Sequence, residues 1–366
     1  MRPIYLNGRF LSQPVTGVQR FAREMTGALD RLWNKRFQDP PTLLIPAAGV
    51  GQNPDYTNIR VHKIGRLNGH LWEQFELPMW ISGGILVNLA NSAPLFVHRQ
   101  IIVLHDASVF VHPEAYSRSY CLFHTMLERI LVRSKARLAT VSAFSRDELS
   151  HYLHIEPSRL ALLTEGSDHI LRVPSDRTII EQHGLVSRNY VLVVGSLVAH
   201  KNLSSLGNLA EMLAGRGLHL VIAGVTVARV FDTEKMTLPS SAIYLGRISD
   251  SALRALYAEA ICLVFPSLYE GYGIPPVEAM ACGCPVVSST AGAVKEVCGD
   301  AALYCDPNIP QDFSAAVARL IDEPGLANVL RKRGSDRVKT LTWDNAAHVL
   351  AELIKRYQRE TEGIDQ

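Results

Sequence analysis

Short apolar runs alternate with longer amphipathic segments along almost all of the 366 residues. The runs are rich in Val, Ile and Leu and are bounded by polar residues, glycine or proline, which is typical of buried strands. The longer segments repeat apolar residues at three- and four-residue spacings, which is typical of helices that bury one face. This alternation predicts α/β architecture, in which parallel strands are covered by helices on both sides.

The first half of the chain predicts a first series of strands and helices. The strands are expected at residues 4–6, 42–45, 85–88, 101–105, 137–141 and 160–164. The helices are expected at residues 18–33, 116–135 and 144–153. Residues 167–187 carry Pro174 and mixed polar side chains. We interpret this segment as the boundary that follows a first domain at residues 1–170.

A second series follows and predicts a second domain at residues 171–342. Its strands are expected at residues 190–195, 218–224, 261–265 and 285–288. Its helices are expected at residues 203–213, at 249–259 with Ser249 as the N-cap, from Pro276 onward, and through most of 312–362. Two such series predict two Rossmann-like domains that face each other, with ligands at the carboxyl ends of the strands.

Composition and charge narrow the functional classes. The formal net charge of only +2 gives no indication of nucleic-acid binding. Residues 1–170 nevertheless hold 18 Lys and Arg against 14 Asp and Glu, and nine of the thirteen histidines. This bias fits peripheral association with an anionic membrane surface, or an anionic acceptor, and it fits a scattered solvated surface equally well.

The cysteines and the N-terminus predict a cytoplasmic protein. The six cysteines lie mostly in apolar contexts, which is typical of buried reduced thiols. The one-residue spacing of Cys282 and Cys284 differs from the spacing of common zinc and redox motifs. The first residues predict a strand and a turn rather than a signal peptide. No apolar run approaches the ~18 residues that a membrane span needs.

The most informative segment is residues 268–287, which contains two carboxylates beside a glycine loop. Glu270 lies at the edge of the loop, and Glu278 lies eight positions later on the expected helix. A strand, a glycine turn and a helix N-terminus together form an anion site, because backbone N–H groups and the helix dipole point at it. Carboxylates beside such a site indicate a ligand with both phosphates and hydroxyls, as in a nucleotide sugar.

This segment, LYEGYGIPPVEAMACGCPVV, resembles the donor-site signature of retaining glycosyltransferases of family 4, which have the GT-B fold. Other stretches are similar to the same family: VVGSLVAHKNL at 193–203, TVSAFS at 140–145, YLGRISD at 244–250 and GDAALYCDP at 299–307. WEQFELP at 72–78 resembles members that act on bacterial surface polysaccharides. The resemblance covers nearly the whole chain. It implies an N-terminal acceptor domain, a C-terminal donor domain facing it across a cleft, and a final helix, about 343–366, that crosses back to the N-terminal domain.

The resemblance assigns the two carboxylates to the donor. Glu270 is expected to accept hydrogen bonds from hydroxyls of the donor sugar, and Glu278 from hydroxyls of the ribose. Charge compensation of the helix dipole is an alternative role for Glu278. The backbone of the intervening loop is expected to cradle the sugar or phosphate; its residues are Gly271, Tyr272, Gly273 and Ile274.

Lys201 is expected to stabilise the diphosphate of the leaving nucleotide with a compact positive charge. The loop before it contains Gly195 and Ser196. Many members of the family carry an arginine beside the loop glycine or the lysine, where this chain has Ser196 and His200. Neutralisation of the leaving group is therefore expected to depend more heavily on Lys201, and Arg247 is a further candidate for phosphate or base.

In the first domain the resemblance indicates His105, near the donor sugar, and Asp106, as an acceptor-side base. Gly17 lies in a glycine loop that is expected beneath the diphosphate. Arg20 either binds phosphate or is a surface residue of the helix, and both alternatives stay open. Ser142 is either a donor contact or only the N-cap of a helix.

The expected reaction needs no metal or cofactor. The sequence has no Asp-x-Asp pattern, and Mg²⁺-dependent nucleotide-sugar enzymes commonly hold the metal through carboxylates. We expect a retaining glycosyltransferase that moves a hexose, with GDP-mannose as the donor hypothesis, to a hydroxyl of a glycan or lipid-linked acceptor. Two alternatives stay open: a phosphorylase-like GT-B enzyme with a lysine-bound pyridoxal phosphate, and a non-catalytic partner subunit that binds nucleotide sugars.

Overall fold

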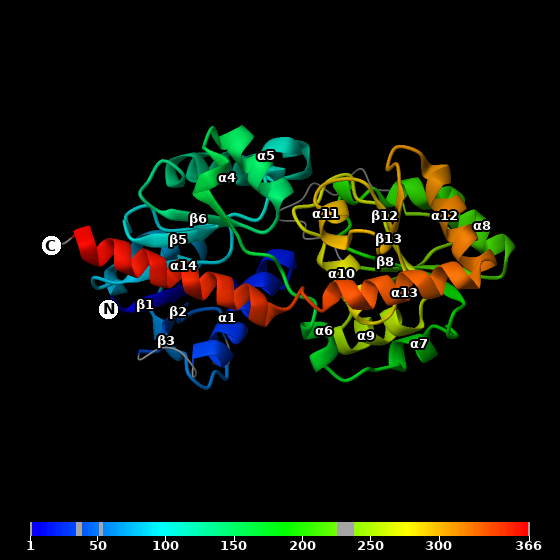
Figure 1. Cartoon of the computed structure of the whole chain (residues 1–366), viewed down its shortest axis with the longest axis horizontal. Coiled ribbons are helices and arrows are strands. Elements are labelled where there is room, and N and C mark those ends of the chain that lie inside the picture. Colours follow the sequence, from blue (N-terminus) through cyan, green and yellow to red (C-terminus); the bar gives the residue numbers. More distant parts are fainter. Residues whose placement is uncertain (1, 34–38, 51–53, 225–237, 365–366) are drawn as a thin grey trace. The chain divides into compact units, whose positions relative to one another are not determined.

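The computed structural model describes residues 2–33, 39–50, 54–224 and 238–364 (Figure 1). The chain divides into two compact units. Unit 1 comprises residues 1–107, 122–165 and 343–366, and unit 2 comprises residues 108–121 and 166–342. Each unit holds one parallel sheet, so the predicted fold class of two parallel-sheet α/β domains is confirmed.

Unit 1 has a seven-stranded parallel sheet in the order β3-β2-β1-β4-β5-β6-β7. Its strands are β1 (Ile4–Asn7), β2 (Thr42–Pro46), β3 (Arg60–Ile64), β4 (Ile85–Asn88), β5 (Gln100–Val103), β6 (Arg137–Thr140) and β7 (Leu160–Leu162). Strand order reverses between β1 and β4, which are neighbours in the sheet. This order is that of a Rossmann-like sheet, whose ligands bind outside the carboxyl ends of the strands at the reversal point.

The helices of unit 1 include α1 (Gly17–Trp33), α2 (Gly69–Leu71), α5 (Ala143–Leu153), α14 (Trp343–Ile364) and most of α4 (Arg118–Leu131). The last helix, α14, packs against the first long helix, α1 (Figure 1). Phe21 on α1 meets Trp343 edge to face at 5.8 Å, and Arg31 pairs with Asp344 at 2.7 Å. Residues from both ends of the chain therefore share the core of one unit.

Unit 2 has a six-stranded parallel sheet in the order β10-β9-β8-β11-β12-β13. Its strands are β8 (Tyr190–Val194), β9 (His219–Ala223), β10 (Ile243–Gly246), β11 (Leu263–Phe265), β12 (Val286–Ser289) and β13 (Ala302–Cys305). Its helices are α3 (Ser108–Val111), α6 (His169–Arg172), α7 (Thr178–Gln182), α8 (Gly207–Gly215), α9 (Asp250–Glu259), α10 (Ile274–Ala281), α11 (Val294–Cys298), α12 (Pro310–Asp322) and α13 (Pro324–Val338).

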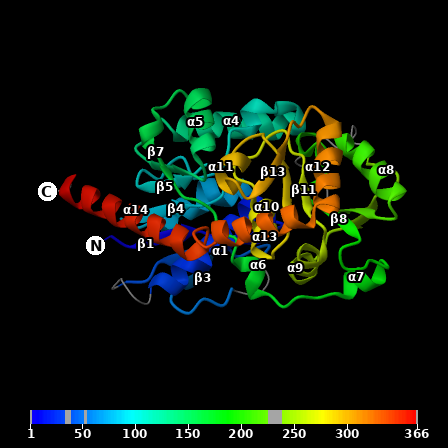
Figure 2. The ribbon, with the colours of Figure 1, turned by 45° about the vertical axis from the view of Figure 1, so that its right-hand side comes forward.

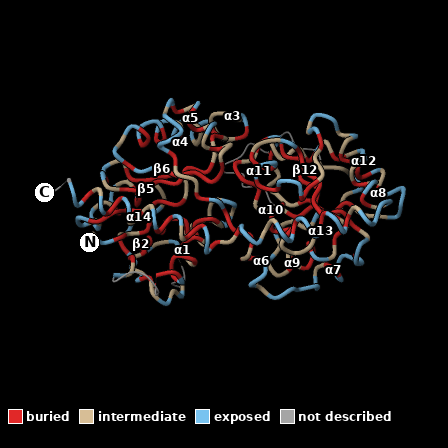
Figure 3. The backbone as a smooth tube through the Cα atoms, in the orientation of Figure 1, coloured by how far each residue is buried: buried red, intermediate tan, exposed pale blue. Residues whose placement is uncertain are grey.

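Alternate residues of the unit 2 strands point into two separate cores. Tyr190 and Leu192 of β8 join a core with α6, α7, α9, α10 and α11, whereas Val191 and Val193 join a core with α8 and α12. Figure 2 shows α13 beside α10, and Figure 3 shows that buried residues follow the strands. Because both faces of the sheet are covered, these strands appear in the sequence as continuous apolar runs.

The strands expected from the apolar pattern omit β3, β10 and β13, each of which lies at an edge of its sheet. Only Ile64 of β3 is buried, and no residue of β10 is. An edge strand with one open side needs few apolar residues, so it leaves no apolar run in the sequence. The expected boundary region also contains two short helices, α6 and α7. The N-cap role of Ser249 is confirmed, because its hydroxyl accepts a hydrogen bond from the Ala252 N–H at 3.1 Å.

All six cysteines are described as free thiols, and four of them are buried. Within the described ranges, no helix is both long and apolar enough to span a membrane.

Candidate functional site

An ion pair lies at the point where strand order reverses in unit 2. β8 and β11 are neighbours in the sheet although β9 and β10 separate them in the chain. Lys201 lies in the turn after β8, and Glu270 lies in the loop after β11. The Lys201 Nζ donates a hydrogen bond to Glu270 Oε1 at 2.5 Å. Both side chains are largely covered, at 18% and 11% exposure, so a positive and a negative group share the crevice where open α/β sheets bind ligands.

The loop that carries Glu270 is held by a glycine that the sequence reasoning did not single out. The Ala293 N–H donates to the Glu270 carbonyl at 2.9 Å. Gly292 has φ +64°, and a Cβ there would lie only 2.3 Å from the same carbonyl oxygen. Gly292 therefore permits the contact that fixes Glu270, and its place just after β12 is the only sign of this in the sequence.

The start of α10 supplies fewer donors than a helix N-terminus usually does. Gly273 precedes the helix in the left-handed conformation, with φ 103°, and α10 begins at Ile274. Pro275 and Pro276 occupy the first turn and have no backbone N–H. The dipole of α10 still favours an anion beside Gly271, Tyr272 and Gly273, but two of the leading N–H groups are missing.

Glu278 is supported by two buried side chains that sequence reasoning missed. Its Oε1 lies 2.7 Å from His169 Nε2, and its Oε2 accepts a hydrogen bond from the Tyr257 hydroxyl at 2.9 Å. Glu278 is only 5% exposed. Burial and the nearby carboxylate raise the pKa of Tyr257 well above its usual value. Each carboxylate oxygen can accept further hydrogen bonds, so the ribose role of Glu278 stays a prediction.

The turn before Lys201 places a neutral histidine next to the lysine. Burial, with smaller contributions from the charge of Lys201 and from His112, lowers the pKa of His200 to about 3. The His112 ring stacks on His200 at 6.2 Å and meets Tyr269 edge to face at 5.5 Å. Because His200 is neutral near pH 7, it does not replace the arginine that many relatives carry here, and Lys201 carries the positive charge of this turn.

Close backbone packing shapes the same turn. A Cβ at Gly224 would lie 1.7 Å from the Gly195 carbonyl oxygen, so only glycine fits beside that loop. A Cβ at Gly195 would touch the stem of Lys201 at 3.7 Å. Ser196 is half-buried in the turn, whereas Arg247, after β10, is exposed. Roles for Ser196 and Arg247 in binding the donor stay predictions.

In unit 1, His105 follows β5 and is held by protein groups on all sides. It is 4% exposed. Its Nε2 lies 3.0 Å from the Leu89 carbonyl oxygen, and its Nδ1 lies 3.6 Å from Glu165 Oε1. The Phe21 and His105 rings are perpendicular, with their centroids 4.6 Å apart. These contacts fix the orientation of His105, and its predicted place near the donor sugar is not tested by them.

Asp106 has an acidic neighbour that sequence reasoning missed. Glu128 on α4 is 3% exposed. Burial, followed by the charge of Asp106, raises the pKa of Glu128 well above its usual value. Within the described part of the chain, Glu128 Oε2 has no hydrogen-bond partner. A buried carboxyl group whose pKa is raised by burial and by a neighbouring carboxyl group is typical of functional sites, so Glu128 and Asp106 mark the carboxyl ends of the unit 1 strands as a candidate site.

A buried ion pair lies at the carboxyl end of β1. Arg9 Nε donates to Glu73 Oε1 at 3.1 Å, and the Asn7 amide and Ser92 hydroxyl donate to the same oxygen at 2.7 and 2.9 Å. Burial alone would raise the pKa of Glu73, but Arg9, His70 and Asn7 outweigh it and lower the pKa to about 2. The WEQFELP stretch thus supplies a buried anchor for the reversal point of the unit 1 sheet.

The remaining candidates of unit 1 lie at helix starts. Gly17 is the first residue of α1. Arg20 is half-buried and lies 3.7 Å from Glu24 on the same helix, so both alternatives for Arg20 stay predictions. Ser142 is buried and caps α5 by accepting a hydrogen bond from the Ser145 N–H at 2.9 Å. Contacts of Gly17 and Ser142 with a donor stay predictions.

No group of three or more His, Cys, Asp or Glu side chains within the described ranges is arranged to hold a metal ion. The metal-independent reaction stays a prediction.

Comparisons with known proteins indicate the family of the part of the chain that contains this ion pair. Residues 175–337, which include Lys201, Glu270 and Glu278, match the family model described as Glycosyl transferases group 1. The O-antigen chain mannosyltransferase B of Escherichia coli is 27% identical to this chain, over 92% of this chain and 94% of that protein. The O-antigen chain mannosyltransferase RfbU of Salmonella typhimurium is 25% identical, over 72% of this chain and 74% of that protein.

Solved structures share the whole fold at low sequence identity. Sucrose-phosphate synthase from Thermosynechococcus elongatus has a TM-score of 0.72 at 16% identity and covers 98% of this chain and 100% of its own. WaaG, a glycosyltransferase involved in lipopolysaccharide biosynthesis, has a TM-score of 0.69 at 15% identity and covers 96% and 99%. The matched family region, the relatives and the shared fold together identify this chain as a glycosyltransferase of GT-B fold that carries a group 1 domain at residues 175–337.

Proposed function

We propose that this glycosyltransferase moves mannose from GDP-mannose to a hydroxyl of a glycan or lipid-linked oligosaccharide in the synthesis of a surface polysaccharide. The observation that carries the proposal is the Lys201–Glu270 ion pair at the reversal point of the unit 2 sheet. It pairs a group suited to phosphate with a group suited to sugar hydroxyls. The names of the relatives, O-antigen mannosyltransferases, support mannose as the sugar and surface polysaccharide as the product.

In this proposal, Lys201 and Glu270 contact different parts of the bound donor. The Lys201 ammonium faces the diphosphate and stabilises the charge that develops as the nucleotide leaves. Glu270 accepts hydrogen bonds from the sugar hydroxyls, and Glu278 accepts them from the ribose. His169 and Tyr257 hold Glu278 in position for this task.

We favour a retaining, front-face reaction. The acceptor oxygen attacks the anomeric carbon on the side from which the diphosphate departs. The bond to the phosphate oxygen breaks, and that oxygen takes the proton of the acceptor hydroxyl. A double displacement needs a carboxylate across the scissile bond from the acid, about 5–5.5 Å away. Glu270 and Glu278 are both assigned to donor binding, which leaves neither for that role.

Acceptor binding is assigned to unit 1, where Asp106 is the candidate acceptor-side group that accepts a hydrogen bond from the attacking hydroxyl before the phosphate oxygen takes its proton. Peripheral association with a membrane fits a lipid-linked acceptor. Two features support it: the basic bias of residues 1–170 and the exposed apolar residues on one face of α4, namely Leu122, Met126 and Ile130. Apolar side chains beside positive charge are typical of proteins that bind anionic membrane surfaces.

Two experiments test the proposal. In a thermal-shift comparison of GDP, UDP, dTDP and ADP, GDP is expected to raise the melting temperature most, because a ligand that binds the native state stabilises it. Incubation with GDP-mannose and an acceptor is then expected to give a mannosylated product by mass spectrometry. A larger shift with UDP or dTDP would contradict GDP-mannose as the donor. If neither GDP-mannose nor a UDP- or dTDP-sugar is turned over, a non-catalytic subunit is favoured. A pyridoxal phosphate absorption band would favour the phosphorylase-like alternative.

A further inference from the structure

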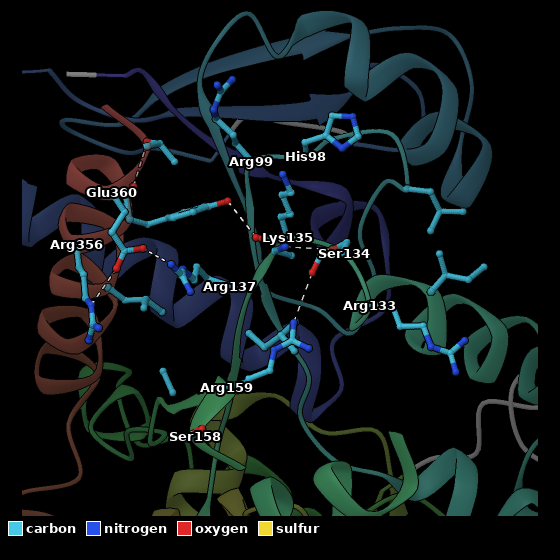
Figure 4. A pocket seen from close by; sticks show the side chains of 18 residues that line it. His98, Arg99, Arg133, Ser134, Lys135, Arg137, Ser158, Arg159, Arg356 and Glu360 are labelled. Carbon is cyan, nitrogen blue, oxygen red and sulfur yellow. Dashed lines mark hydrogen bonds and ion pairs between the residues drawn. The ribbon is translucent and has the colours of Figure 1, made fainter. Parts of the chain in front are cut away.

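Unit 1 has a basic pocket of about 1360 Å³, and Figure 4 shows the side chains that line it. Arg99 lies just before β5, Arg137 is the first residue of β6, and Arg159 lies just before β7. The pocket is thus at the amino ends of three parallel strands. The predicted site residues His105 and Ser142 follow the carboxyl ends of β5 and β6, which are the opposite ends of these strands.

The charge of the pocket is strongly unbalanced. Six Lys and Arg side chains line it against a single carboxylate: Arg99, Arg133, Lys135, Arg137, Arg159 and Arg356, with Glu360. Glu360 lies between Arg137 and Arg356, as Figure 4 shows, and pairs with both. One negative charge therefore serves two guanidinium groups.

Two basic residues of the pocket, Lys135 and Arg159, differ from Arg137 and Arg356 in their ion pairing. Among the residues that the structure describes, neither side chain has a carboxylate within salt-bridge distance. The Arg159 guanidinium donates a long 3.5 Å hydrogen bond to the Ser134 carbonyl oxygen. Both residues are exposed, so they reach the pocket without being part of the core.

Capping of α4 does not account for these charges. The last carbonyls of the helix are already satisfied, because Ile130 accepts from the Arg133 N–H at 3.2 Å and Leu131 accepts from the Ser134 N–H at 3.0 Å. The basic residues also come from four separate segments of the chain, including α14. Like charges gathered from separate segments repel one another unless an anion lies among them.

We propose that this pocket is a binding site for a phosphate-bearing ligand, separate from the sugar donor. Guanidinium forks such as those of Arg137 and Arg159 bind phosphate oxygens in pairs, and Lys135 adds a compact charge. A soluble polyphosphate and the headgroup of an anionic phospholipid share this chemistry. Ile130 at the rim is the last of the exposed apolar residues on α4, which favours the lipid source. The proposal does not depend on the identity of the sugar or the base of the donor.

The test compares the wild-type chain with Lys135→Gln/Arg159→Gln. Arg60→Gln/Lys63→Gln is the matched control, because it also removes two exposed positive charges. Both lie on β3, at the edge of the sheet opposite β7. Binding is measured to inorganic triphosphate by calorimetry and to phosphatidylglycerol–phosphatidylcholine vesicles by co-sedimentation. The pocket variant is expected to lose at least about tenfold in affinity for one probe or both, whereas the control keeps wild-type affinity.

The probe whose binding is lost in the pocket variant shows whether the phosphate-bearing ligand is a lipid headgroup or a soluble anion. Loss with vesicles alone indicates a lipid headgroup, and loss with triphosphate alone indicates a soluble anion. Lys201→Ala identifies triphosphate bound at the donor site and is expected to leave pocket binding unchanged. The GDP-induced thermal shift of the pocket variant is expected to equal that of the wild type. The pocket proposal can therefore fail while the donor proposal stands, and the reverse. The proposal is overturned if the wild type binds neither probe, or if both double variants lose the same affinity.

Discussion

Lys201 and Glu270, which are 69 positions apart in the chain, meet in a 2.5 Å ion pair where the strand order of unit 2 reverses. Each residue follows the carboxyl end of its own strand. The pair forms only because β8 and β11 are neighbours in the sheet. It therefore links the topology of the domain directly to the chemistry that we propose for the donor.

Replacing Lys201 is expected to weaken the binding of the nucleotide. Lys201→Ala removes a charged contact to the diphosphate, and binding of GDP should fall by about 1.5–3 kcal/mol, as for the loss of a charged hydrogen bond. Calorimetric titration with GDP measures the change. Lys295→Ala, at an exposed lysine of α11, is the matched control and should bind GDP as the wild type does. Equal affinity in Lys201→Ala and the wild type would remove Lys201 from the site.

Replacing Glu270 is expected to separate turnover from nucleotide affinity. Glu270→Gln keeps the size of the side chain but loses the negative charge that binds sugar hydroxyls, so turnover should fall by about tenfold or more. Because GDP has no sugar at this position, its affinity should change little or rise as Lys201 loses its partner. Steady-state kinetics and GDP titration measure the two quantities. A large loss of GDP affinity with unchanged turnover contradicts the role, as does a glycosyl group trapped covalently on Glu270 in the wild type.

The apolar runs predicted the architecture. The expectation that ligands bind at the carboxyl ends of parallel strands predicted the regions around Lys201 and Glu270. Central strands such as β8 and β11 are apolar on both faces, so the apolar pattern identifies them. The edge strands β3, β10 and β13 escaped it because one side lies open. The direct Lys201–Glu270 contact also escaped it, because strand order is a property of the folded sheet.

The supporting side chains could not be predicted, since they act through contacts between distant segments. Glu278 meets His169 and Tyr257 only once α6, α9 and α10 have packed. Glu128 on α4 looks like an ordinary polar residue of an amphipathic helix, and only its burial beside Asp106 makes it unusual. No spacing along the chain signals such a pair.

Removing the hydroxyl of Tyr257 is expected to destabilise unit 2. Tyr257→Phe leaves one oxygen of the buried Glu278 without its donor, and the loss of a hydrogen bond to a charged group costs about 1.5–3 kcal/mol. Tyr190→Phe is a matched control, because that buried hydroxyl donates at 2.8 Å to the neutral Leu256 carbonyl, and its loss should cost only about 0.5–1.5 kcal/mol. Urea unfolding measures both values. A smaller loss for Tyr257→Phe than for the control would show that Tyr257 does not hold the carboxylate.

Acid is expected to weaken unit 1 through Glu73. Its pKa is about 2 in the folded chain against an ordinary value of 4.5, so between these values the unfolded chain binds more protons. The stabilisation is complete above about pH 4.5 and is lost as the pH falls toward 2, with a size on the order of 3 kcal/mol. Glu73→Gln should lower stability at pH 7, because Arg9 stays buried beside a neutral group. It should also flatten the dependence of stability on pH between 5 and 3.

Unfolding by urea at several pH values between 3 and 7 tests this expectation. Glu156→Gln is the control, because Glu156 is exposed and has no salt bridge in the ranges that the structure describes. It should keep both the stability and the pH dependence of the wild type. If Glu73→Gln loses stability with acid as steeply as the wild type, the Arg9–Glu73 pair is not the source of the acid sensitivity. The buried cluster at β1 would then act through packing alone.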